Sequence, residues 1–549
     1  MPTMHITDEV DFSLSKANLA ALGRMQVPVP TKPAQSIIQQ LMARRNERSL
    51  HRRKCDFTGE NIISAYPAET PFPVYKNEVW WSDQWDPMQY GRDFDFSKTF
   101  FEQFAELINV VPREGTSVFN SENCDYNGHC RRSRNCYMST LIAGSEDVHY
   151  SYWIVNAQDM MDCYFVNNST LCYDCIDGEN LYNCIKIQDC LNCQDCYFSY
   201  QLIGCNNCIA CSNLQRKDYH ILNEPVSKEE FDRVRSELLS GTRSGYALGE
   251  ELFQQMWGNA INRCFHNINC ENSVGDHLLN CKNTIACFDA TEVEDCAYCI
   301  SMSDSKDILF SHSAGWPRCE LVHCSAVSRG STNIAYCYYT FHSSNLRYCD
   351  SSMTINNCFG CTGLRHKDYC IFNKQYTPDE YEKLSNRIIE HMKETGEWGE
   401  YFPIHHSTFA YNDSAAQDYF PLSEEEVLGN GWVWRDEEST KAPAGAKPVP
   451  NIPISQVTDD ICKEVFICEE SGRPFRFVKQ ELSFYRKMNL PLPTSALDAR
   501  FRSRLDRRNP HQIVARTCSE TGEKILSSYG AEHQGRVCSE DYYVNNVLA

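Results

Sequence analysis

The sequence has no long hydrophobic run. A membrane-spanning helix needs roughly 18 or more consecutive apolar residues, and no such stretch occurs in the 549-residue chain. A basic segment followed by an apolar run, which is typical of a secretory signal, does not open the sequence either. We therefore expect a cytoplasmic protein without a membrane-spanning segment, in which the thiols stay reduced.

Positive charge is scarce as well. The chain has 52 Lys and Arg against 73 Asp and Glu, a net charge of -21. This balance argues against binding along a nucleic-acid backbone, where phosphate contacts need clustered cations. Two local groups are exceptions: Arg44, Arg45, Arg48, Arg52 and Arg53, and Arg502, Arg504, Arg507 and Arg508. We interpret both as solvated basic faces, with contact to RNA or a ribonucleoprotein as the alternative.

The motifs of the common enzyme classes are absent. The sequence contains no G-x-x-x-x-G-K-[ST], no H-E-x-x-H, no G-x-S-x-G and no G-x-G-x-x-G, so we predict no catalytic residues. A polysaccharide-cleaving β-helix enzyme is one alternative, and a nucleophilic cysteine paired with a histidine is another. The residues considered for them are Asp147, Asp159, Asp174 and Asp177, and His149, His220, His405 and His406. The aspartates stand at positions typical of tight turns, which is the interpretation we favour.

Cysteine is abundant, with 31 residues, and much of it keeps one phase. The run from Cys163 to Cys211 holds ten cysteines, each a multiple of three residues from every other. In rows of 21 residues, Cys163, Cys184 and Cys205 share a column. Fixed columns at a fixed period indicate a solenoid. The sequence therefore predicts a parallel β-helix of about 21 residues per coil, with the sulfurs facing its axis as small hydrophobes.

The neighbours of these cysteines fit the same interpretation. The other residues in the inward phase are small or apolar: Val166, Ser169, Gly178, Leu181, Ile187, Ser199 and Leu202. The residue before the cysteine is often Asn or Asp: Asp162, Asp174, Asn183, Asp189, Asn192, Asp195 and Asn207. These side chains tolerate the left-handed conformation, so each position predicts a tight turn.

A large part of the chain is duplicated. The Lys-Asp-Tyr-x-Ile-x-Asn block at Lys217 recurs at Lys367, an offset of 150 residues. A helix with a capping box follows each copy, beginning at Ser227 and at Thr377. In the second copy the phase slips between Cys270, Cys281 and Cys319, which predicts insertions at turns.

A Cys-x-x-[Ser/Thr]-Gly pentapeptide occurs three times, at Cys55, Cys468 and Cys518. It has the outline of a zinc knuckle with the second thiolate replaced. A structural zinc site needs four ligands, so we expect metal-free knuckles and no cofactor. The one candidate zinc set, in the C-terminal module, is Cys518, Cys538, Asp541 and His533. A store for soft metals along an interior column of thiols is an alternative.

The knuckles, the duplicated block, the Glu-Trp-Gly-Glu-Tyr-Phe-Pro segment at Glu397 and the Leu-Pro-Leu-Pro run at Leu490 resemble a group of uncharacterised cysteine-rich bacterial proteins. The resemblance covers nearly everything after residue 50. Members sometimes carry a CaiB/BaiF CoA-transferase label, for which no residue here provides the chemistry. In that pattern the knuckles are two-pair zinc ribbons. The implied ligand sets are Cys55, Thr58, Lys76 and Val79, then Cys468, Ser471, Ala496 and Ala499, and finally Cys518, Thr521, Cys538 and Asp541.

These observations together predict a mainly β protein with two duplicated β-helix halves, capping helices and degenerate zinc-ribbon-like modules at both ends. The predicted segments are an arm and basic helix (1–54), a knuckle with a capping helix (55–113), the first half (114–224), a helical insertion (225–257), the second half (258–374), a capping helix with a draped segment (375–438), a linker (439–453) and two knuckle modules (454–549). The predicted function is a non-enzymatic scaffold that presents its terminal modules to a protein partner.

Overall fold

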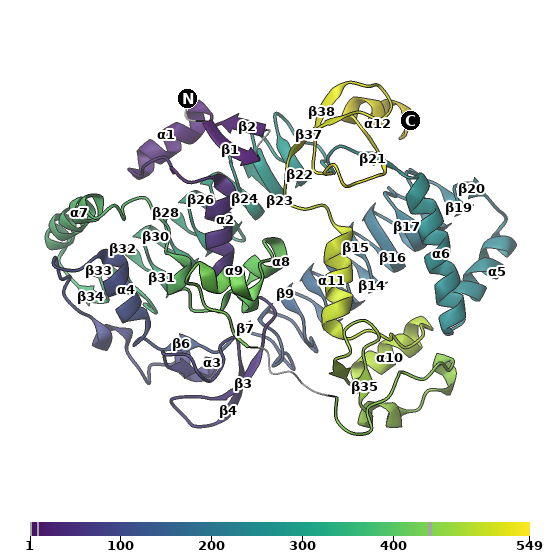
Figure 1. Ribbon diagram of the computed structural model, residues 1–549, viewed down its shortest axis with the longest axis horizontal. Helices are drawn as coiled ribbons and strands as arrows, with labels where there is room; N and C mark the ends of the chain where they lie inside the picture. The colour runs from purple at the N-terminus through teal and green to yellow at the C-terminus, as the bar shows by residue number, and fades with distance from the viewer. Residues whose placement is uncertain (1–2, 8–9, 437–441, 549) are drawn as a thin grey trace.

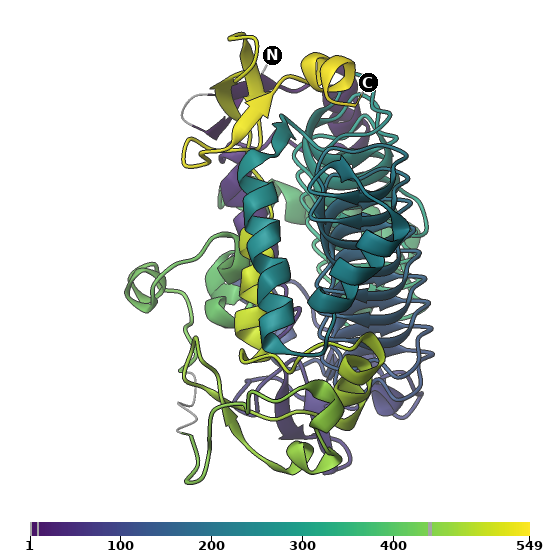
Figure 2. The same cartoon turned by 90° about the vertical axis from the view of Figure 1, so that its right-hand side faces the viewer.

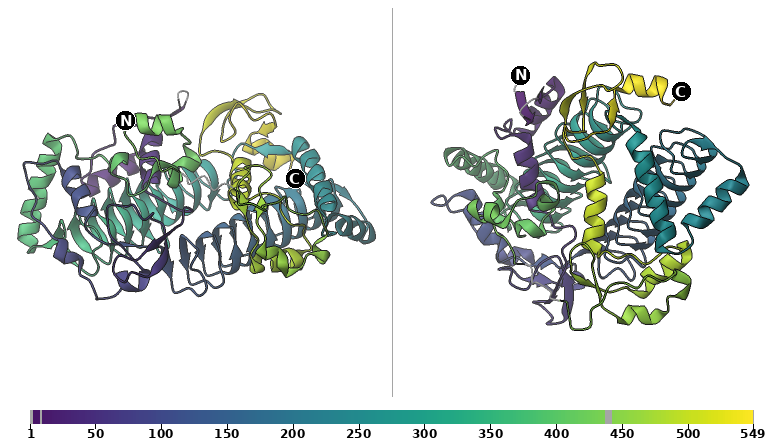
Figure 3. Two further views of the ribbon diagram at one scale, coloured as in Figure 1. Left: turned by 60° about the horizontal axis from the view of Figure 1, so that its bottom comes forward. Right: turned by 45° about the vertical axis from the view of Figure 1, so that its right-hand side comes forward.

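The computed structural model describes residues 3–7, 10–436 and 442–548. The protein is mainly β and contains two large curled sheets that lie next to each other (Figures 1 and 3). The first sheet has 14 strands: β7 Ser117–Phe119, β8 His129–Arg131, β9 Thr140–Ala143, β10 Glu146–His149, β11 Tyr152–Val155, β12 Gln158–Met161, β13 Tyr164–Asn167, β14 Thr170–Tyr173, β15 Ile176–Glu179, β16 Tyr182–Leu191, β17 Gln194–Tyr200, β18 Asn206–Ile209, β19 Asp218–Ile221 and β20 Glu224–Pro225. The second sheet has 13: β22 Val274–Leu279, β23 Ile285–Glu294, β24 Ile300–Leu309, β25 His312–Ala314, β26 Cys319–His323, β27 Ala326–Arg329, β28 Thr332–Ala335, β29 Tyr338–Phe341, β30 Ser344–Arg347, β31 Asp350–Met353, β32 Asn356–Phe359, β33 Asp368–Ile371 and β34 Lys374–Gln375.

Most strands of both sheets pair in parallel with partners twelve residues further along the chain. Tyr152 lies opposite Tyr164, and Tyr164 opposite Ile176, so successive turns of the chain lie on one another (Figure 2). The predicted period of 21 residues is therefore wrong, and Cys163, Cys184 and Cys205 do not share a column. Stacked cysteine pairs instead include Cys172 with Cys184, Cys196 with Cys208 and Cys358 with Cys370. Because 12 and 21 are both multiples of three, the cysteine phase alone does not distinguish them.

The backbone conformation explains why inward residues recur every three positions. Every third residue from Arg132 to Leu222 has a positive φ, and the seven Asn and Asp residues predicted at turns have φ between 50° and 55°. That prediction is confirmed. Since twelve residues make one turn of the chain and every third is left-handed, each turn has four corners. Asn and Asp suit these corners because they visit the left-handed region at the lowest cost among residues with a side chain.

The residue after each corner faces inward. The predicted inward set and all ten cysteines between 163 and 211 are buried, which confirms this part of the sequence interpretation. The Cys163 thiol lies 3.4 Å from the Met161 carbonyl oxygen, two residues back. Serine does the same more strongly: Ser145 Oγ donates to the Ala143 oxygen and accepts the Ala157 N–H of the next turn. Small side chains with one donor therefore satisfy interior backbone carbonyls.

The phase slips of the second sheet are also confirmed, but only one of them is the insertion that was predicted, and the other is a deletion. Glu271 lies opposite Lys282, eleven residues on, and the register shifts at Gly275. Between β24 and β26 the offset is fourteen residues, from Ser305 to Cys319. One turn has thus lost a residue, and another has gained two next to Trp316.

The duplicated block ends both sheets in the same way. The side chain of Asn223 accepts a hydrogen bond from the backbone N–H of Ser212 and donates one to the Ser212 carbonyl. Asn373 does the same with Thr362, and in both cases the partner lies eleven positions back. Ser227 caps its helix at the backbone of Glu230, and Thr377 forms the full reciprocal capping box. The last strand of each sheet is therefore followed by a helix, which limits edge-to-edge association.

The helices and the terminal segments cover the sheets. The helices are α1 Lys16–Met25, α2 Ala34–Ala43, α3 Asn77–Trp80, α4 Phe100–Ile108, α5 Lys228–Leu238, α6 Arg243–Asn259, α7 Pro378–Glu394, α8 Ala415–Tyr419, α9 Glu424–Gly429, α10 Lys479–Met488, α11 Leu497–Arg507 and α12 Glu540–Asn546. No helix within residues 3–7, 10–436 and 442–548 is long and apolar enough to cross a membrane. The predicted arm lies on the second sheet, where Arg24 pairs with Asp307 at 2.7 Å. The α11 helix runs along the junction of the two sheets (Figure 1). Residues 439–441 of the predicted linker lie outside the described residues.

Candidate functional site

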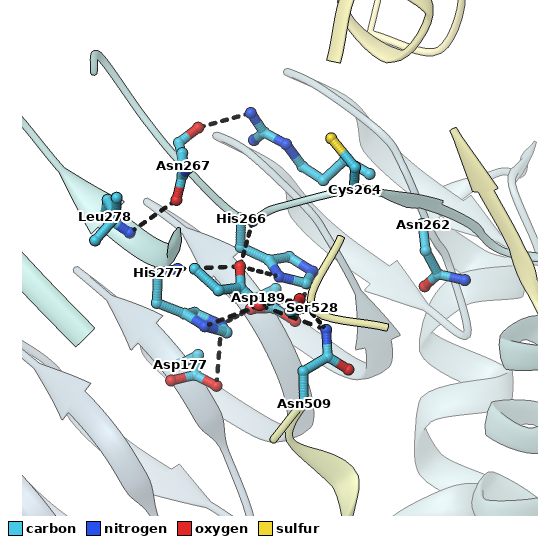
Figure 4. A network of polar contacts seen from close by, with 12 residues as sticks. Asp177, Asp189, Asn262, Cys264, His266, Asn267, His277, Leu278, Asn509 and Ser528 are labelled. Carbon is cyan, nitrogen blue, oxygen red and sulfur yellow. Dashed lines mark hydrogen bonds and ion pairs between the residues drawn. The ribbon is translucent and has the colours of Figure 1, made fainter. Parts of the chain in front are cut away.

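A cluster of charged side chains is buried where the two curled sheets meet (Figure 4). The first sheet provides Asp177 from β15 and Asp189 from β16. The second provides Asp276 and His277 from β22 and Asp289 from β23. These five residues come from chain segments about a hundred residues apart, so the cluster exists only because the sheets pack together.

The repeat explains why these side chains leave the sheets. Asp177, Asp189, His277 and Asp289 all occupy left-handed corners, with φ between 50° and 54°. The first two are twelve residues apart, as are the last two, so each pair occupies one corner in successive turns. A corner side chain points away from the interior, and at this junction it meets the corners of the other sheet.

His266, in the segment before β22, is held by Asp276. The Nδ1 atom of His266 lies 3.0 Å from Asp276 Oδ1, and the His266 backbone N–H donates to the same oxygen at 2.6 Å. Ser528 Oγ donates to the other Asp276 oxygen. These contacts fix the ring, so its Nε2 atom faces Asp189 Oδ2 at 3.7 Å.

His277 lies between two carboxylates of the first sheet. Its Nε2 atom is 2.9 Å from Asp189 Oδ1 and 3.4 Å from Asp177 Oδ2. Its ring stacks on His266 with centroids 4.8 Å apart. Figure 4 shows both rings beside Asp189, with Asp177 on the side of His277.

Burial and charge set the protonation of this cluster. Burial by itself would lower the pKa of His277, but Asp177, Asp276 and Asp189 outweigh burial and raise that pKa to about 10. Burial favours the neutral form of Asp276 as well, but the two histidines hold its pKa well below the usual value. At neutral pH His277 is therefore protonated and Asp276 is ionised.

Arg508 ties the two sheets together at the cluster. Its guanidinium contacts both oxygens of Asp177, at 2.8 and 2.9 Å, and also reaches Asp289 at 2.5 Å. It lies over the Phe165 ring, and its side chain is 3% exposed. A bidentate pair of this kind fixes direction as well as distance, so the segment after α11 acts as a clamp between the sheets.

Two cavities border the cluster. One of about 330 Å³ is lined by Trp153 and Phe165 of the first sheet and Trp316 of the second, together with charged residues of the cluster. The other, of about 420 Å³, is lined by residues that include Phe253, Trp257 and Tyr529. Asp189, His266 and His277 line both cavities and so separate them.

No protein-family model and no curated protein matches this chain. The site therefore has to be interpreted from its own geometry. Its composition of imidazoles, carboxylates and aromatic walls next to open volume is typical of a small-molecule or metal site.

The arginines predicted to form solvated faces are mostly buried, and that prediction is wrong for them. Arg44 is fully buried and pairs with Asp350 at 2.8 Å; Arg45 is buried beside Glu47 and His312. Arg53 is buried, Arg48 is half-buried over the Phe501 ring, and only Arg52 of this group is exposed. Their partners are up to 370 residues away in sequence, so a local charge count does not find them.

The second arginine group behaves in the same way. Arg504 pairs with Asp162 at 2.9 Å, and Arg507 pairs with Asp174, both on the first sheet. Arg502 is the exposed member, with 44% of its side chain exposed and Asp418 at 3.3 Å. Arg504, Arg507 and Arg508 lie on one side of α11 and its end, and this side binds the corner aspartates Asp162, Asp174 and Asp177 of the first sheet.

The residues predicted for zinc do not come together. Among the described residues, only two groups of His, Cys, Asp or Glu have their ligand atoms within 4.8 Å of one another: Cys124, Cys130 and Cys136, and Asp189, His266 and His277. Cys518, Cys538, Asp541 and His533 are not among them. Asp541 is exposed, and His533 contacts Asn262.

The three knuckles share one turn that does not need metal. In each, the Cys N–H donates to the residue five positions on and the Gly N–H donates back to the Cys oxygen. The glycines have φ between 68° and 75°, which explains why glycine recurs there. The sulfurs of Cys55, Cys468 and Cys518 accept backbone N–H groups from Lys76, Ala496 and Ser539. Backbone donors thus take the place that a second pair of ligands has in a zinc ribbon.

The sequence interpretation missed most of the cluster. Of the residues weighed for catalysis, only Asp177 belongs to it. Asp147 continues a ladder with Asn135, Asp159 pairs with Lys487, and Asp174 pairs with Arg507. His149, His220, His405 and His406 lie elsewhere. The signal that would have found the site is the twelve-residue spacing of acids and histidines at corner positions, which a period of 21 conceals.

The thiols differ sharply in access, and this gives a testable expectation. All 31 cysteines are free, and only Cys270 and Cys462 are not buried. A hydrogen bond from Cys281 lowers the pKa of Cys270 to about 6, whereas burial raises that of Cys462. Because the thiolate is the nucleophile, a maleimide should label Cys270 first in the native protein. Cys270→Ser should remove the fast phase and Cys462→Ser should retain it; a fast phase that survives Cys270→Ser contradicts the expectation.

Proposed function

We propose that the two curled sheets are parallel β-helices that serve as a rigid scaffold for a small-molecule binding site at their junction. The observation that carries this proposal is the cavity of about 330 Å³, which both sheets line and which borders the buried charged cluster. Its volume falls in the range of known ligand sites, roughly 300–1,000 Å³. In this arrangement the repeated turns make the protein rigid, and the residues at the junction bind the ligand.

The terminal modules pack against the two sheets, which supports a structural role for them within the protein. Strand β39 (Arg536–Cys538) of the third knuckle pairs with β21 (Ile261–Arg263), just before the second sheet. The second knuckle module packs on the first sheet through α10, where Glu481 contacts Tyr150. Burial of most of the arginines fits the same picture, since buried guanidinium groups are not available to RNA phosphates.

The cavity walls favour a carbohydrate. Trp153 stacks on Phe165 at 5.1 Å between centroids and lies 6.3 Å from Trp316 of the other sheet. Aromatic faces pack against the apolar face of a sugar ring, and carboxylates accept hydrogen bonds from its hydroxyl groups. Asp177 and Asp189 are already engaged by Arg508 and His277. They therefore suit hydrogen bonding to a ligand better than proton transfer to one.

A glycan array followed by calorimetry tests this function. We expect the protein to retain a defined oligosaccharide, and Trp153→Ala to weaken that binding about tenfold by removing a central aromatic wall. Trp81→Ala is the matched control, because Trp81 is exposed and does not line the cavity. An array without any bound glycan, or equal affinities for the two variants, would overturn the proposal.

A further inference from the structure

We propose that Asp189, His266 and His277 form a binding site for a divalent transition-metal ion such as Zn²⁺. One ligand atom from each residue lies within 4.8 Å of the others. The metal would take the place of the proton that His277 carries in the metal-free protein, because a ligating imidazole is neutral. Two imidazoles and one carboxylate are ligands that Zn²⁺ and neighbouring first-row metals prefer over Mg²⁺ or Ca²⁺. The site concerns a different ligand from the carbohydrate and does not depend on it.

The orientation of His266 supports this assignment. A metal-binding histidine almost always donates its second ring N–H to a carboxylate or carbonyl, which fixes the tautomer and the ring. Asp276 holds His266 in this way, with Oδ1 at 3.0 Å from Nδ1. The Nε2 atom is thereby left as the acceptor of the ring. It faces Asp189 Oδ2, and the hydroxyls of Tyr200 and Tyr529 contact it where a metal ion would take their place. Asp276 is itself fixed by Ser528.

An unsatisfied oxygen points into the same space. Asp189 Oδ2 is buried and has no hydrogen-bond partner, and the Asp189 side chain is only 7% exposed. Buried carboxylate oxygens are rarely left without a partner, because the lost hydration is not replaced. This oxygen lies 3.7 Å from His266 Nε2. A cation between them would satisfy it and would replace an incomplete polar network by direct ligation.

The surroundings leave room for further ligands. The three residues border open volume on both sides, as shown by the two cavities they line. Tyr200 and Tyr529 place their hydroxyls 3.3 Å from His266 Nε2, within reach of a metal-bound water. Asp177 Oδ2 lies 3.4 Å from His277 Nε2. Three protein ligands with an open position are typical of zinc sites that take part in reactions rather than of structural ones.

The thiol group of the first sheet is the competing site. Cys124, Cys130 and Cys136 are inward-facing and buried, and the thiols of Cys124 and Cys136 already donate to backbone carbonyls of their own turns. Their ligation would have a thiolate signature, whereas the junction site has only nitrogen and oxygen ligands. The two sites are therefore distinguishable in one experiment.

The test uses the full chain, stripped of metal by a chelator and kept under a non-chelating reductant. Calorimetric titration with Zn²⁺ should give one equivalent bound by the parent protein and by Cys124→Ser. His266→Gln and the isosteric Asp189→Asn should each weaken that binding by about 100-fold, and Asp276→Asn by about 10- to 100-fold, since it acts through His266. His366→Gln is the control, because His366 is exposed, lies just before β33 and lines neither of the two cavities. Trp153→Ala should leave the titration unchanged, which separates this proposal from the proposed carbohydrate site.

Cobalt reports the ligand type without any variant. Co²⁺ bound to the parent protein should give visible absorption bands and no thiolate charge-transfer band. Absence of Zn²⁺ binding by the parent protein would overturn the proposal. It would also fail if Cys124→Ser abolished binding while Asp189→Asn and His266→Gln retained it, or if the cobalt spectrum showed sulfur ligation.

Discussion

Replacing Arg508 with Met should lower the free energy of unfolding by about 3–5 kcal/mol, the usual cost of removing one partner of a buried ion pair. The loss arises because Asp177 and Asp289 would both remain buried without their shared cation. Methionine keeps most of the packing against Phe165. The measurement is denaturant unfolding followed by tryptophan fluorescence, compared at the transition midpoint.

Arg502→Met is the matched control. Arg502 belongs to the same group of arginines, but it is 44% exposed and its pair with Asp418 is solvated. Such a pair contributes about 0–1 kcal/mol. The combined variant Asp177→Asn with Arg508→Met neutralises one of the two buried carboxylates that lose their partner, so it should recover part of the lost stability. Equal destabilisation by the Arg508 and Arg502 variants would show that the clamp is not what holds the sheets together.

Acidification should destabilise the protein well before its carboxylates titrate. Burial lowers the pKa of His129 and His323 to about 3 and that of His149 to about 4. In the unfolded chain these histidines take up protons near 6.5. Their contribution is therefore complete above that pH and is lost progressively as the pH falls toward 3–4. At pH 5.5 the three together should cost roughly 4 kcal/mol.

Two of these histidines make a sharp test. His149 and His323 are buried with Nδ1 atoms that have no hydrogen-bond partner, and His323 packs edge-on against Phe310 and Tyr336. The double variant His149→Phe with His323→Phe should retain stability at pH 8 and unfold at a lower pH than the parent protein. His366→Phe, at an exposed position, should leave the acid transition in place. An unchanged transition in the double variant would show that other groups control acid unfolding.

The fold was predictable where the signal is local. The inward phase of the cysteines, the Asn and Asp corners and the helices that follow the two sheets all depend on residues close together in the chain, and each is confirmed. The length of the turn was not predictable in the same way. Closure after four corners depends on how the backbone pairs with itself, and the cysteines fill too few of the inward positions to show it.

The site was not predictable for a different reason. Asp177, Asp189 and His277 look like ordinary corner residues, and most corners with such residues are solvated. They become a site because the second sheet and Arg508 remove them from water. The same long-range pairing hid the partners of the arginines, since Arg508 and Asp177 are 331 residues apart.

The twelve-residue register also limits how the gene can change. Duplicating or deleting twelve codons adds or removes one whole turn and leaves every remaining side chain on its own side of the sheet. A change of three codons keeps inward residues inward but moves them to the neighbouring side. Gain or loss of a single codon moves the inward residues out of the inward position downstream unless the backbone absorbs it locally, as it does at Gly275. Insertions and deletions that keep the codon frame are therefore tolerated best when they also keep the twelve-residue register of the backbone.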